Sequence, residues 1–309
     1  MIDLHCDTIL RLQTEKDGGN LRHNSLSVSL EGLTEINAQA QCFALFTPQE
    51  AEDRWAFMQS MHLRFEREVG DNSDLIHKAA APDGSLCAIL TIEDMGPTEG
   101  IEEREDEVLS WKPRIIGLVW NNENVYARPC SLVSGEMEKG LTDEGRRLAG
   151  RLAAEHVIVD VSHLSDGGFW DLMGMKDVMI IASHSNCRSL CGHQRNLTDE
   201  MIRAIADRGG VVGLNFCPVF LREQPGRTIE ETESRIEDMV AHVRHMIDAG
   251  GEDVIALGSD NDGIGGQLEI ARVSDMPRLL DALSASGLSD RVLEKFWYLN
   301  ARRVLTEGL

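Results

Sequence analysis

Short apolar runs recur along the chain, and longer stretches separate them. Each run holds three to nine residues and is rich in β-branched or other apolar side chains, a composition typical of strands buried on both faces. The segments between the runs have the amphipathic spacing of surface helices. The predicted strands cover residues 2–4, 38–46, 87–92, 115–120, 157–161, 178–182, 210–216 and 254–258.

Helical spacing is clearest in three of the intervening stretches, at 51–70, 142–155 and 228–250. The last of them ends in glycine, as helices commonly do. Its apolar residues gather near one predicted face, namely Ile229, Ile236, Met239, Val240, Val243, Met246 and Ile247. This pattern predicts one helix over residues 228–250.

The alternation of buried strands and helices indicates a parallel sheet covered on both faces. Eight such units within 309 residues are what a (β/α)8 TIM barrel needs. An open, doubly wound α/β sheet shares the alternation, but no glycine-rich dinucleotide fingerprint follows the first strand. Because the chain has no evident linker or low-complexity tract, we predict one barrel domain over residues 1–309.

Polar side chains stand just past the carboxyl ends of five predicted strands. Each has a simple structural explanation as a helix cap, a turn residue or a satisfied core histidine. In a barrel, however, these positions converge on one mouth, where active sites are built. Independent caps and turns do not explain why three histidines and several carboxylates share that end. The residues are His5 and Asp7, Glu93 and Asp94, His163, His184, Asp260 and Asp262.

The types of these side chains narrow the choice of metal. Imidazole and carboxylate ligands together suit zinc, manganese or iron better than calcium or magnesium. Five ligands exceed what one catalytic zinc with an open position uses. Two ions that share one carboxylate account for the set, and they lower the pKa of a water held between them toward neutrality.

The charge and the cysteines of the chain bear on its partners and location. The formal net charge is -22, and so acidic a surface repels phosphate backbones and anionic membranes. No apolar run reaches the ~20 residues that span a bilayer, and no signal-peptide pattern opens the chain. Seven scattered cysteines fit reduced thiols better than a disulfide framework. We therefore expect a cytoplasmic protein without nucleic-acid or membrane partners.

Several motifs, in their order and at their intervals, resemble the membrane (renal) dipeptidase family of binuclear zinc peptidases, peptidase family M19, a branch of the amidohydrolase barrels. The resemblance covers nearly the whole chain. It rests on DLHCDT at 3–8, TIEDMGP at 91–97, LVWNNEN at 118–124, GLTDEGRRL at 140–148, VDVSHLS at 159–165, IASHSNCRSLCGHQRN at 181–196, GVVGLNF at 210–216 and GSDNDGI at 258–264.

The resemblance implies a metal ligand at each matching position. His5 and Asp7 would bind one ion, and His163 and His184 would bind the other. Glu93 would bridge the two ions, for which Zn²⁺ is the first candidate. A hydroxide held between the ions would then attack the scissile carbonyl.

The same resemblance implies how the proton moves and what holds the substrate. Asp260 would accept the proton of the attacking water and pass it on. Arg195 matches the family arginine that binds the terminal carboxylate of the substrate, a task suited to a planar guanidinium. We also place Asp262, two residues beyond Asp260, among the substrate-facing groups.

One departure from the family pattern affects the substrate site. In the animal enzymes a histidine after the fourth strand helps to polarise the scissile carbonyl, whereas the aligned position here is Trp120. A tryptophan cannot act as the same electrophile, although its indole N–H donates a hydrogen bond. Asn121 or Asn124 is expected to take over part of that role.

The leading hypothesis is a metal-dependent dipeptidase that cleaves dipeptides with a free C-terminal carboxylate, including those with a D-residue at that end. A second hypothesis keeps the metal pair but directs it at another amide, a lactone or an N-acyl amino acid. A third, a non-catalytic barrel scaffold, predicts a missing ligand, yet all the expected ligands stand in the sequence. Dimers are common in the family, so the resemblance also allows a homodimer.

Overall fold

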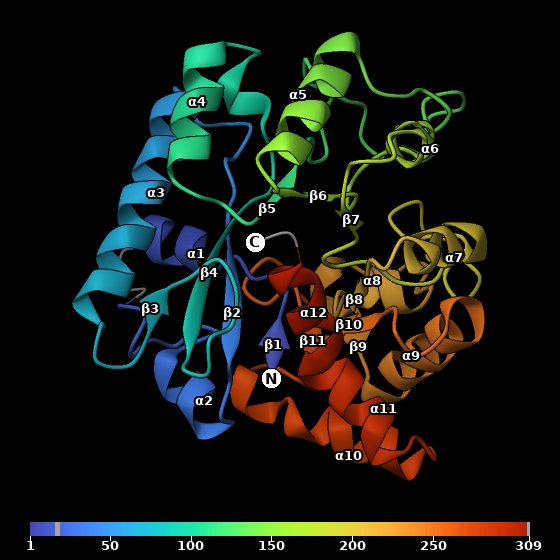
Figure 1. The fold of residues 1–309 in the computed structure, drawn as a ribbon. Coiled ribbons are helices and arrows are strands. Elements are labelled where there is room, and N and C mark those ends of the chain that lie inside the picture. The colour runs from blue at the N-terminus through green and yellow to red at the C-terminus, as the bar shows by residue number, and fades with distance from the viewer. Residues whose placement is uncertain (16–18, 308–309) are drawn as a thin grey trace.

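Parallel strands form the centre of the molecule, and helices surround them (Figure 1). The computed structural model describes residues 1–15 and 19–307. All eight predicted strands are present within their predicted ranges. They are β1 (Ile2–Asp3), β2 (Ala40–Leu45), β4 (Cys87–Ile92), β5 (Ile115–Gly117), β6 (Ile158–Asp160), β7 (Ile180–Ile181), β8 (Val212–Leu214) and β10 (Ile255–Leu257).

The order of the strands shows that the sheet closes on itself. Hydrogen-bonded neighbours follow the order β7-β6-β5-β4-β2-β1-β10-β8, so β1 and β10, the first and last of the eight strands along the chain, are adjacent. A parallel bridge between Ala182 and Val212 joins the two ends of this order. The ring confirms the predicted barrel and excludes the open, doubly wound sheet.

Helices alternate with the strands as the sequence pattern predicts. Several start with a capping side chain that accepts a hydrogen bond from a backbone N–H three residues later, as at Asp53, Thr142, Ser165 and Thr198. Within the described residues, no helix is both long and apolar enough to cross a bilayer. The helices are α1 (Thr8–Thr14), α2 (Leu30–Glu35), α3 (Arg54–Asp71), α4 (Glu102–Ser110), α5 (Asp143–Ala154), α6 (Asp166–Gly174), α7 (Asp199–Asp207), α8 (Pro218–Leu221), α9 (Ile236–Gly250), α10 (Pro277–Ala285), α11 (Asp290–Glu294) and α12 (Asn300–Thr306).

Short strands that the apolar pattern does not predict add local structure outside the ring. Strand β3 (His77–Lys78) pairs in parallel with the start of β4. Strands β9 (Glu233–Ser234) and β11 (Gln267–Leu268) pair with each other. Each has two residues, which is too short for a periodic pattern to identify from sequence.

The predicted helix at 228–250 is wrong over its first eight residues. A 3₁₀ turn at Ile229–Glu231 and strand β9 precede α9, which begins at Ile236. Pairing of β9 with β11 holds Glu233 and Ser234 extended, so tertiary contacts override the helical spacing there. As a result Ile229 is 62% exposed, whereas Met239, Val243 and Met246 are buried as predicted.

A compact apolar cluster takes alternate residues from the strands, as expected for side chains that face the interior of a barrel. Helix α12 packs against this cluster through Ala301, Val304 and Leu305. Arg114, directly before β5, donates a hydrogen bond to the carbonyl of Leu305 (3.0 Å). Helix α12 therefore lies at the amino ends of the strands, opposite the predicted site. The cluster includes Ile2, Leu4, Ala40, Cys42, Cys87, Ile89, Ile115, Ile158, Ile181 and Ala256.

The backbone approaches itself closely where β7, β8 and β10 meet. A Cβ atom at Gly213 would lie 1.9 Å from the carbonyl oxygen of Ser183, and one at Gly258 would lie 1.8 Å from the same oxygen. Glycine at both positions lets the backbone come this close. The closure of the ring therefore depends on these two residues.

We expect Gly258→Ala to destabilise the barrel by roughly 1–3 kcal/mol or more, because the backbone must move to relieve the overlap with Ser183. The control is Gly70→Ala in α3, where an added Cβ meets no described atom within 4 Å and alanine favours the helix. Urea unfolding midpoints measure both effects. Equal midpoints for the two variants would contradict a tight closure at Gly258.

Candidate functional site

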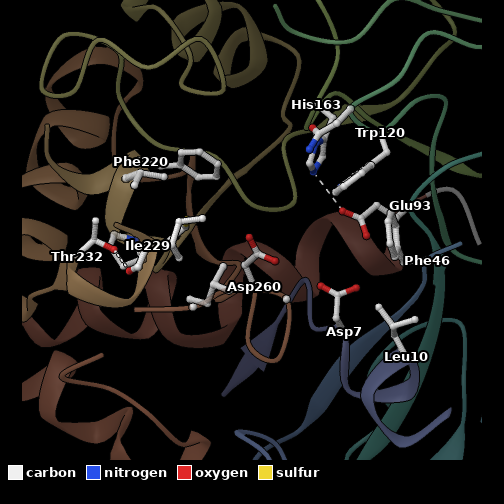
Figure 2. Close-up of a pocket in the computed structure, with 17 residues that line it drawn as sticks. Asp7, Leu10, Phe46, Glu93, Trp120, His163, Phe220, Ile229, Thr232 and Asp260 are labelled. Atoms are coloured by element: carbon white, nitrogen blue, oxygen red, sulfur yellow. Dashed lines mark hydrogen bonds and ion pairs between the residues drawn. The ribbon is translucent and has the colours of Figure 1, made fainter. Parts of the chain in front are cut away.

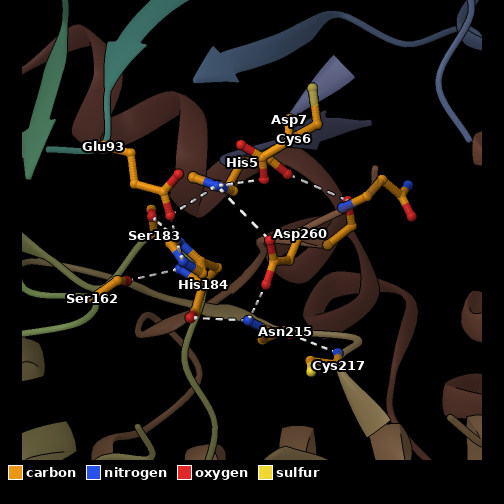
Figure 3. Close-up of polar contacts among 12 residues, drawn as sticks. His5, Cys6, Asp7, Glu93, Ser162, Ser183, His184, Asn215, Cys217 and Asp260 are labelled. Carbon is orange, nitrogen blue, oxygen red and sulfur yellow. Dashed lines mark hydrogen bonds and ion pairs between the residues drawn. The ribbon is translucent and has the colours of Figure 1, made fainter. Parts of the chain in front are cut away.

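Loops at the carboxyl ends of the strands bring the predicted metal ligands into one buried cluster (Figure 3). One oxygen of Glu93, Oε1, lies 3.1 Å from Nε2 of His163 and 3.7 Å from Nε2 of both His5 and His184. Asp7 Oδ2 lies 3.5 Å from the same His5 nitrogen. The five residues come from segments that follow β1, β4, β6 and β7.

Asp260, from the segment after β10, completes the cluster. Its Oδ1 atom lies 3.9 Å from His5 Nε2. Cys6, between two of the predicted ligands, points away from the cluster, and its thiol donates to the carbonyl of Cys42 (3.4 Å). The spacing of two between His5 and Asp7 thus gives both access to the same space.

Three overlapping triads in this cluster could hold metal ions, because the ligand atoms of each lie within 4.8 Å of one another. The first two triads share the carboxylate of Glu93. The third adds Asp260 to two of the histidines. The triads are His5–Asp7–Glu93, Glu93–His163–His184 and His5–His184–Asp260.

Two buried atoms of the cluster have no hydrogen-bond partner among the described residues. They are Nε2 of His5 and Oδ1 of Asp7. Buried polar atoms are nearly always paired, so such atoms in a cluster require an explanation. Divalent ions provide one, because imidazole nitrogen and carboxylate oxygen are both metal ligands. The residues therefore fit the metal centre that the sequence predicted.

Burial and mutual charge shift the pKa values within the cluster. Burial raises the pKa of Glu93 well above its usual range, and the neighbouring Asp7 adds to the rise. Burial also raises the pKa of Asp260 to about 6, against the attraction of His5. For His5, burial favours the neutral form, but the carboxylates around it raise its pKa to about 10.

The other two histidines shift in the opposite direction. Burial, together with the charges of Arg195 and His5, holds the pKa of His163 and of His184 well below the usual histidine value. Both imidazoles are therefore neutral near pH 7. A neutral imidazole keeps the lone pair that a metal ligand needs.

A short chain of hydrogen bonds orients His184. Ser183 Oγ donates its single proton to Asp160 Oδ2, so the same oxygen must accept from His184 Nδ1, which lies 2.7 Å away. Asp160 Oδ1 also accepts from the backbone N–H groups of Ser162 and Ser183, each at 2.9 Å. With its proton on Nδ1, His184 directs the free electron pair of Nε2 toward the cluster.

Side-chain amides hold two more members of the cluster. His163 Nδ1 donates to Asn121 Oδ1 (2.9 Å), which leaves Nε2 free for a ligand role. Asn215 Nδ2 donates to Asp260 Oδ2 (2.9 Å). The sequence analysis did not identify Asn215 or Asp160, although each stands at or just past a strand end, as the predicted ligands do.

The backbone is strained at two of the site residues. His163 and Asp260 have φ angles of 71° and 62°, in the left-handed region that non-glycine residues rarely adopt. Such strain clusters at functional sites, where the surrounding structure enforces it. Gly263 adds a close approach, because a Cβ there would lie 2.1 Å from Asp7 Oδ2. The backbone of the loop after β10 therefore lies close against the carboxylates of Asp7 and Asp260.

A pocket of about 340 Å³ opens beside the cluster (Figure 2). Asp7, Glu93, His163 and Asp260 form its polar side. Trp120 lies on the apolar side, with its ring centre 4.6 Å from that of Phe46 in an edge-on arrangement and 5.9 Å from the imidazole of His163. The remaining apolar walls come from Leu10, Val219, Phe220, Ile229 and Ile264.

The structure does not support a substrate contact for Asp262. This residue is buried and is absent from the lining of the pocket. Its carboxylate accepts hydrogen bonds from Thr8 Oγ1 (2.6 Å) and from the backbone N–H of Ser27 (2.7 Å) and Val28 (3.3 Å). Asp262 therefore joins the loop after β10 to the start of α1 and to the segment before α2.

Two other polar candidates also have structural partners. Asn124 Nδ2 donates to Asp94 Oδ1 (2.9 Å), and its own Oδ1 accepts from the backbone N–H of Tyr126 (2.8 Å). Asp94 pairs further with Arg54 (2.8 Å). These contacts organise the loop after β5 rather than the pocket, so Asn124 does not replace the family histidine.

Arg195 lies behind the pocket wall rather than on it. Its guanidinium carbon is 5.3 Å from the ring centre of Phe220, which does line the pocket. The guanidinium donates two long hydrogen bonds, to Ser185 Oγ (3.4 Å) and to the carbonyl of His184 (3.3 Å). Its buried Nε has no partner among the described residues.

Buried imidazoles and carboxylates at the carboxyl end of a (β/α)8 barrel, beside an apolar pocket, define a class of protein, the metal-dependent barrel hydrolases. Comparison with known proteins narrows this class. The family model of the membrane dipeptidases, peptidase family M19, matches residues 1–308. The chain therefore belongs to the membrane dipeptidase family and is a metal-dependent hydrolase of the dipeptidase type.

Individual relatives agree with this membership. An uncharacterised protein from the pqqA 5′ region of Klebsiella pneumoniae is 37% identical over 229 residues, which are 72% of this chain and 82% of the relative. An uncharacterised dipeptidase of Schizosaccharomyces pombe is 30% identical over 72% of this chain, but the match spans only about half, 53%, of that relative.

A solved structure extends the comparison to a bound ligand. A metallo peptidase from Rhodobacter sphaeroides, in complex with a phosphinate mimic of the dipeptide L-Ala-D-Ala, superimposes with a TM-score of 0.89 at 25% identity. The match covers 98% of this chain and 97% of that one.

We expect Asn121→Ala to weaken binding of one metal ion by about 10–100-fold, because His163 loses the acceptor that orients it. The neighbouring Asn122 is also exposed, so Asn122→Ala is the matched control. Titration of the metal-free variants with Zn²⁺ measures the change. If Asn121 only contacted the substrate, KM would rise while the metal affinity stayed that of the wild type, and the assignment would fail.

Proposed function

We propose that this chain is a binuclear dipeptidase, with His5 and Asp7 at one divalent ion, His163 and His184 at the other, and Glu93 shared between them. The observation that carries the proposal is the position of Glu93 Oε1, within 3.7 Å of the Nε2 atoms of all three histidines. Zn²⁺ is the first candidate, since it accepts this mixture of imidazole and carboxylate ligands.

When bound, two such ions act as Lewis acids and lower the pKa of water enough for it to attack a carbonyl near neutral pH. The protein supplies the proton transfer. Asp260 faces the same space, and burial raises its pKa to about 6. A carboxylate with such a pKa accepts a proton from the attacking water and returns it to the leaving amine. The hydrogen bond from Asn215 keeps Oδ2 occupied, so Oδ1 makes the transfer.

The substrate in this proposal is a dipeptide with a free terminal carboxylate, with a D-residue accepted at that end. The complex of the Rhodobacter sphaeroides relative with a mimic of L-Ala-D-Ala supports this class. Apolar walls at Leu10, Phe46 and Trp120 favour small or apolar side chains in the pocket. Trp120 then acts as a wall of the pocket, where animal relatives carry the polarising histidine.

Arg195 is our candidate for the group that binds the terminal carboxylate. Its Nε has no partner among the described residues and its other hydrogen bonds are long, so the guanidinium is free to take up an anion. Phe220 stands between it and the pocket, and its ring has to turn aside for the contact to form. Phe220 sits in the short helix α8, and its ring also packs on His193, with ring centres 4.7 Å apart.

The compartment in this proposal is the cytoplasm. All seven cysteines, each within the described residues, are free thiols. Free thiols fit a reducing compartment better than an oxidising one.

We expect the purified protein to hydrolyse L,L and L,D dipeptides, and a chelator to abolish the activity. The Glu93 carboxylate binds both ions in this proposal, so Glu93→Ala should contain up to two metal equivalents fewer than the wild type. His5 binds one ion, so His5→Ala should contain about one equivalent fewer. Elemental analysis with dipeptide hydrolysis measures both. Equal metal loss in the two variants would argue against Glu93 as the bridge. Cleavage that persists in the presence of a chelator would contradict a metal-dependent mechanism.

We expect Arg195→Ala to lower kcat/KM for dipeptides by about 100-fold or more, the usual cost of removing one partner from a buried charge pair. The control substrate is a dipeptide amide, which lacks the terminal carboxylate. Its kcat/KM should differ little between the variant and the wild type. Metal content should be unchanged. An Arg195→Ala enzyme with full activity on its best substrate would instead favour the hydrolysis of another amide, a lactone or an N-acyl amino acid.

A further inference from the structure

A second cluster of metal-ligating side chains lies at the other end of β4. Strand β3 pairs with β4 so that His77 and Cys87 are direct neighbours across the two strands. The loop between them returns through Asp83, and the turn after it uses Gly84 with a φ of 109°, a conformation that favours glycine. The ligand atoms of His77, Asp83 and Cys87 all lie within 4.8 Å of one another.

The distances in this cluster resemble those of a tetrahedral zinc site. The Cys87 sulfur lies 3.7 Å from His77 Nε2 and 3.5 Å from Asp83 Oδ1, and His77 Nε2 lies 2.8 Å from Asp83 Oδ2. Around one zinc ion, a sulfur stands about 3.6 Å from a nitrogen or oxygen ligand, and nitrogen stands about 3.4 Å from oxygen. The sulfur and the nitrogen approach different oxygens of Asp83, so the carboxylate has to turn and its distance from His77 has to widen.

The environment of the three groups allows that adjustment. The side chains of His77 and Asp83 are 41% and 53% exposed, so they can separate without disturbing packing. Cys87 is fully buried at the start of β4, which fixes the thiol in place. Ser85 donates from both its hydroxyl (2.9 Å) and its backbone N–H (3.2 Å) to Asp83 Oδ1, which holds the carboxylate toward the cysteine.

We propose that His77, Asp83 and Cys87 form a second, structural metal site for a zinc-type divalent ion, separate from the catalytic cluster. One imidazole, one carboxylate and one thiolate supply three protein ligands, one fewer than in a closed structural zinc site, and water completes the tetrahedron. The ion displaces the thiol proton on binding. It ties β3 and the 79–86 loop to the first residue of β4.

This site and the catalytic cluster are distinct. Cys87 is the first residue of β4, and Glu93 directly follows its last residue. Six residues of strand separate the two sites by roughly 20 Å. The catalytic cluster contains imidazoles and carboxylates, so a bound thiolate provides a signal specific to the second site.

Cobalt substitution tests the proposal in the full-length protein. Co²⁺ bound to thiolate gives a strong charge-transfer absorption in the near ultraviolet, which imidazole and carboxylate ligands do not give. We expect the Co²⁺-loaded wild type to show this band at one equivalent per chain. Cys87→Ser and His77→Ala should each lose it, and Glu93→Ala should keep it despite losing catalytic metal and activity.

Matched variants separate a built site from a fortuitous thiol contact. His245 makes a comparable surface pair with Asp199 at 2.8 Å, so His245→Ala should leave the band intact. Cys217 lines the catalytic pocket, and Cys217→Ser should also retain the band. His77→Ala should keep its dipeptidase activity, which shows that the variant is folded.

Three results would overturn the proposal. The first is a Co²⁺-loaded wild type without the band. The second is a band that survives in Cys87→Ser, because another thiol then binds the metal. The third is a band that survives in both His77→Ala and Asp83→Ala, because the thiol of Cys87 then binds cobalt without the other two ligands.

Discussion

Three carboxylates and three imidazoles buried in one cluster impose the constraint on which the rest of the site depends. Asp7, Glu93 and Asp260 all lie within 3.9 Å of His5 Nε2. Removing charged groups from water is costly unless partners compensate them. The proposed divalent ions satisfy both kinds of group at once, because they favour charged carboxylates and neutral imidazoles. The cluster is thus a structure that metal binding completes.

The polar residues around the cluster have one common task, which is to fix the direction of a ligand atom. Asp160 and Ser183 set the tautomer of His184, and Asn121 does the same for His163. Asn215 leaves one oxygen of Asp260 free. Asp262 acts at a greater distance by joining the loop that carries Asp260 to the start of α1. Several polar residues near the strand ends therefore orient the ligands rather than take part in the chemistry.

Sequence alone could predict the barrel and the residues that gather at its mouth, because both follow from where apolar runs end. A residue that directly follows a buried strand lies at the carboxyl end of the barrel, as His5, Glu93 and His184 do. This position does not determine where a side chain points within the mouth. Asp262 and Asp260 are two residues apart in one turn, yet the first contacts Thr8 and the second faces the cluster.

Other failures of the sequence analysis have the same origin in tertiary contacts. Residues 228–235 have apolar spacing that continues into α9, but they form a 3₁₀ turn and strand β9, which pairs with β11, and Ile229 in the turn lies at the pocket. The role of Arg195 stays a prediction, and the ring of Phe220, which lies 5.3 Å from its guanidinium carbon, belongs to α8 and has no signal in the local motif. Contacts between distant segments decide both features.

The two ends of β4 present different ligands, and this difference bears on how metals distribute in the protein. The carboxyl end offers imidazole and carboxylate groups, which zinc, manganese and iron all accept as ligands. The amino end adds a buried thiolate, a soft ligand that manganese binds poorly and zinc binds well. An ion held by Cys87 would stabilise the strand that carries Glu93. The proposed structural ion can therefore be zinc whichever metal serves catalysis, and the identity of one does not determine the other.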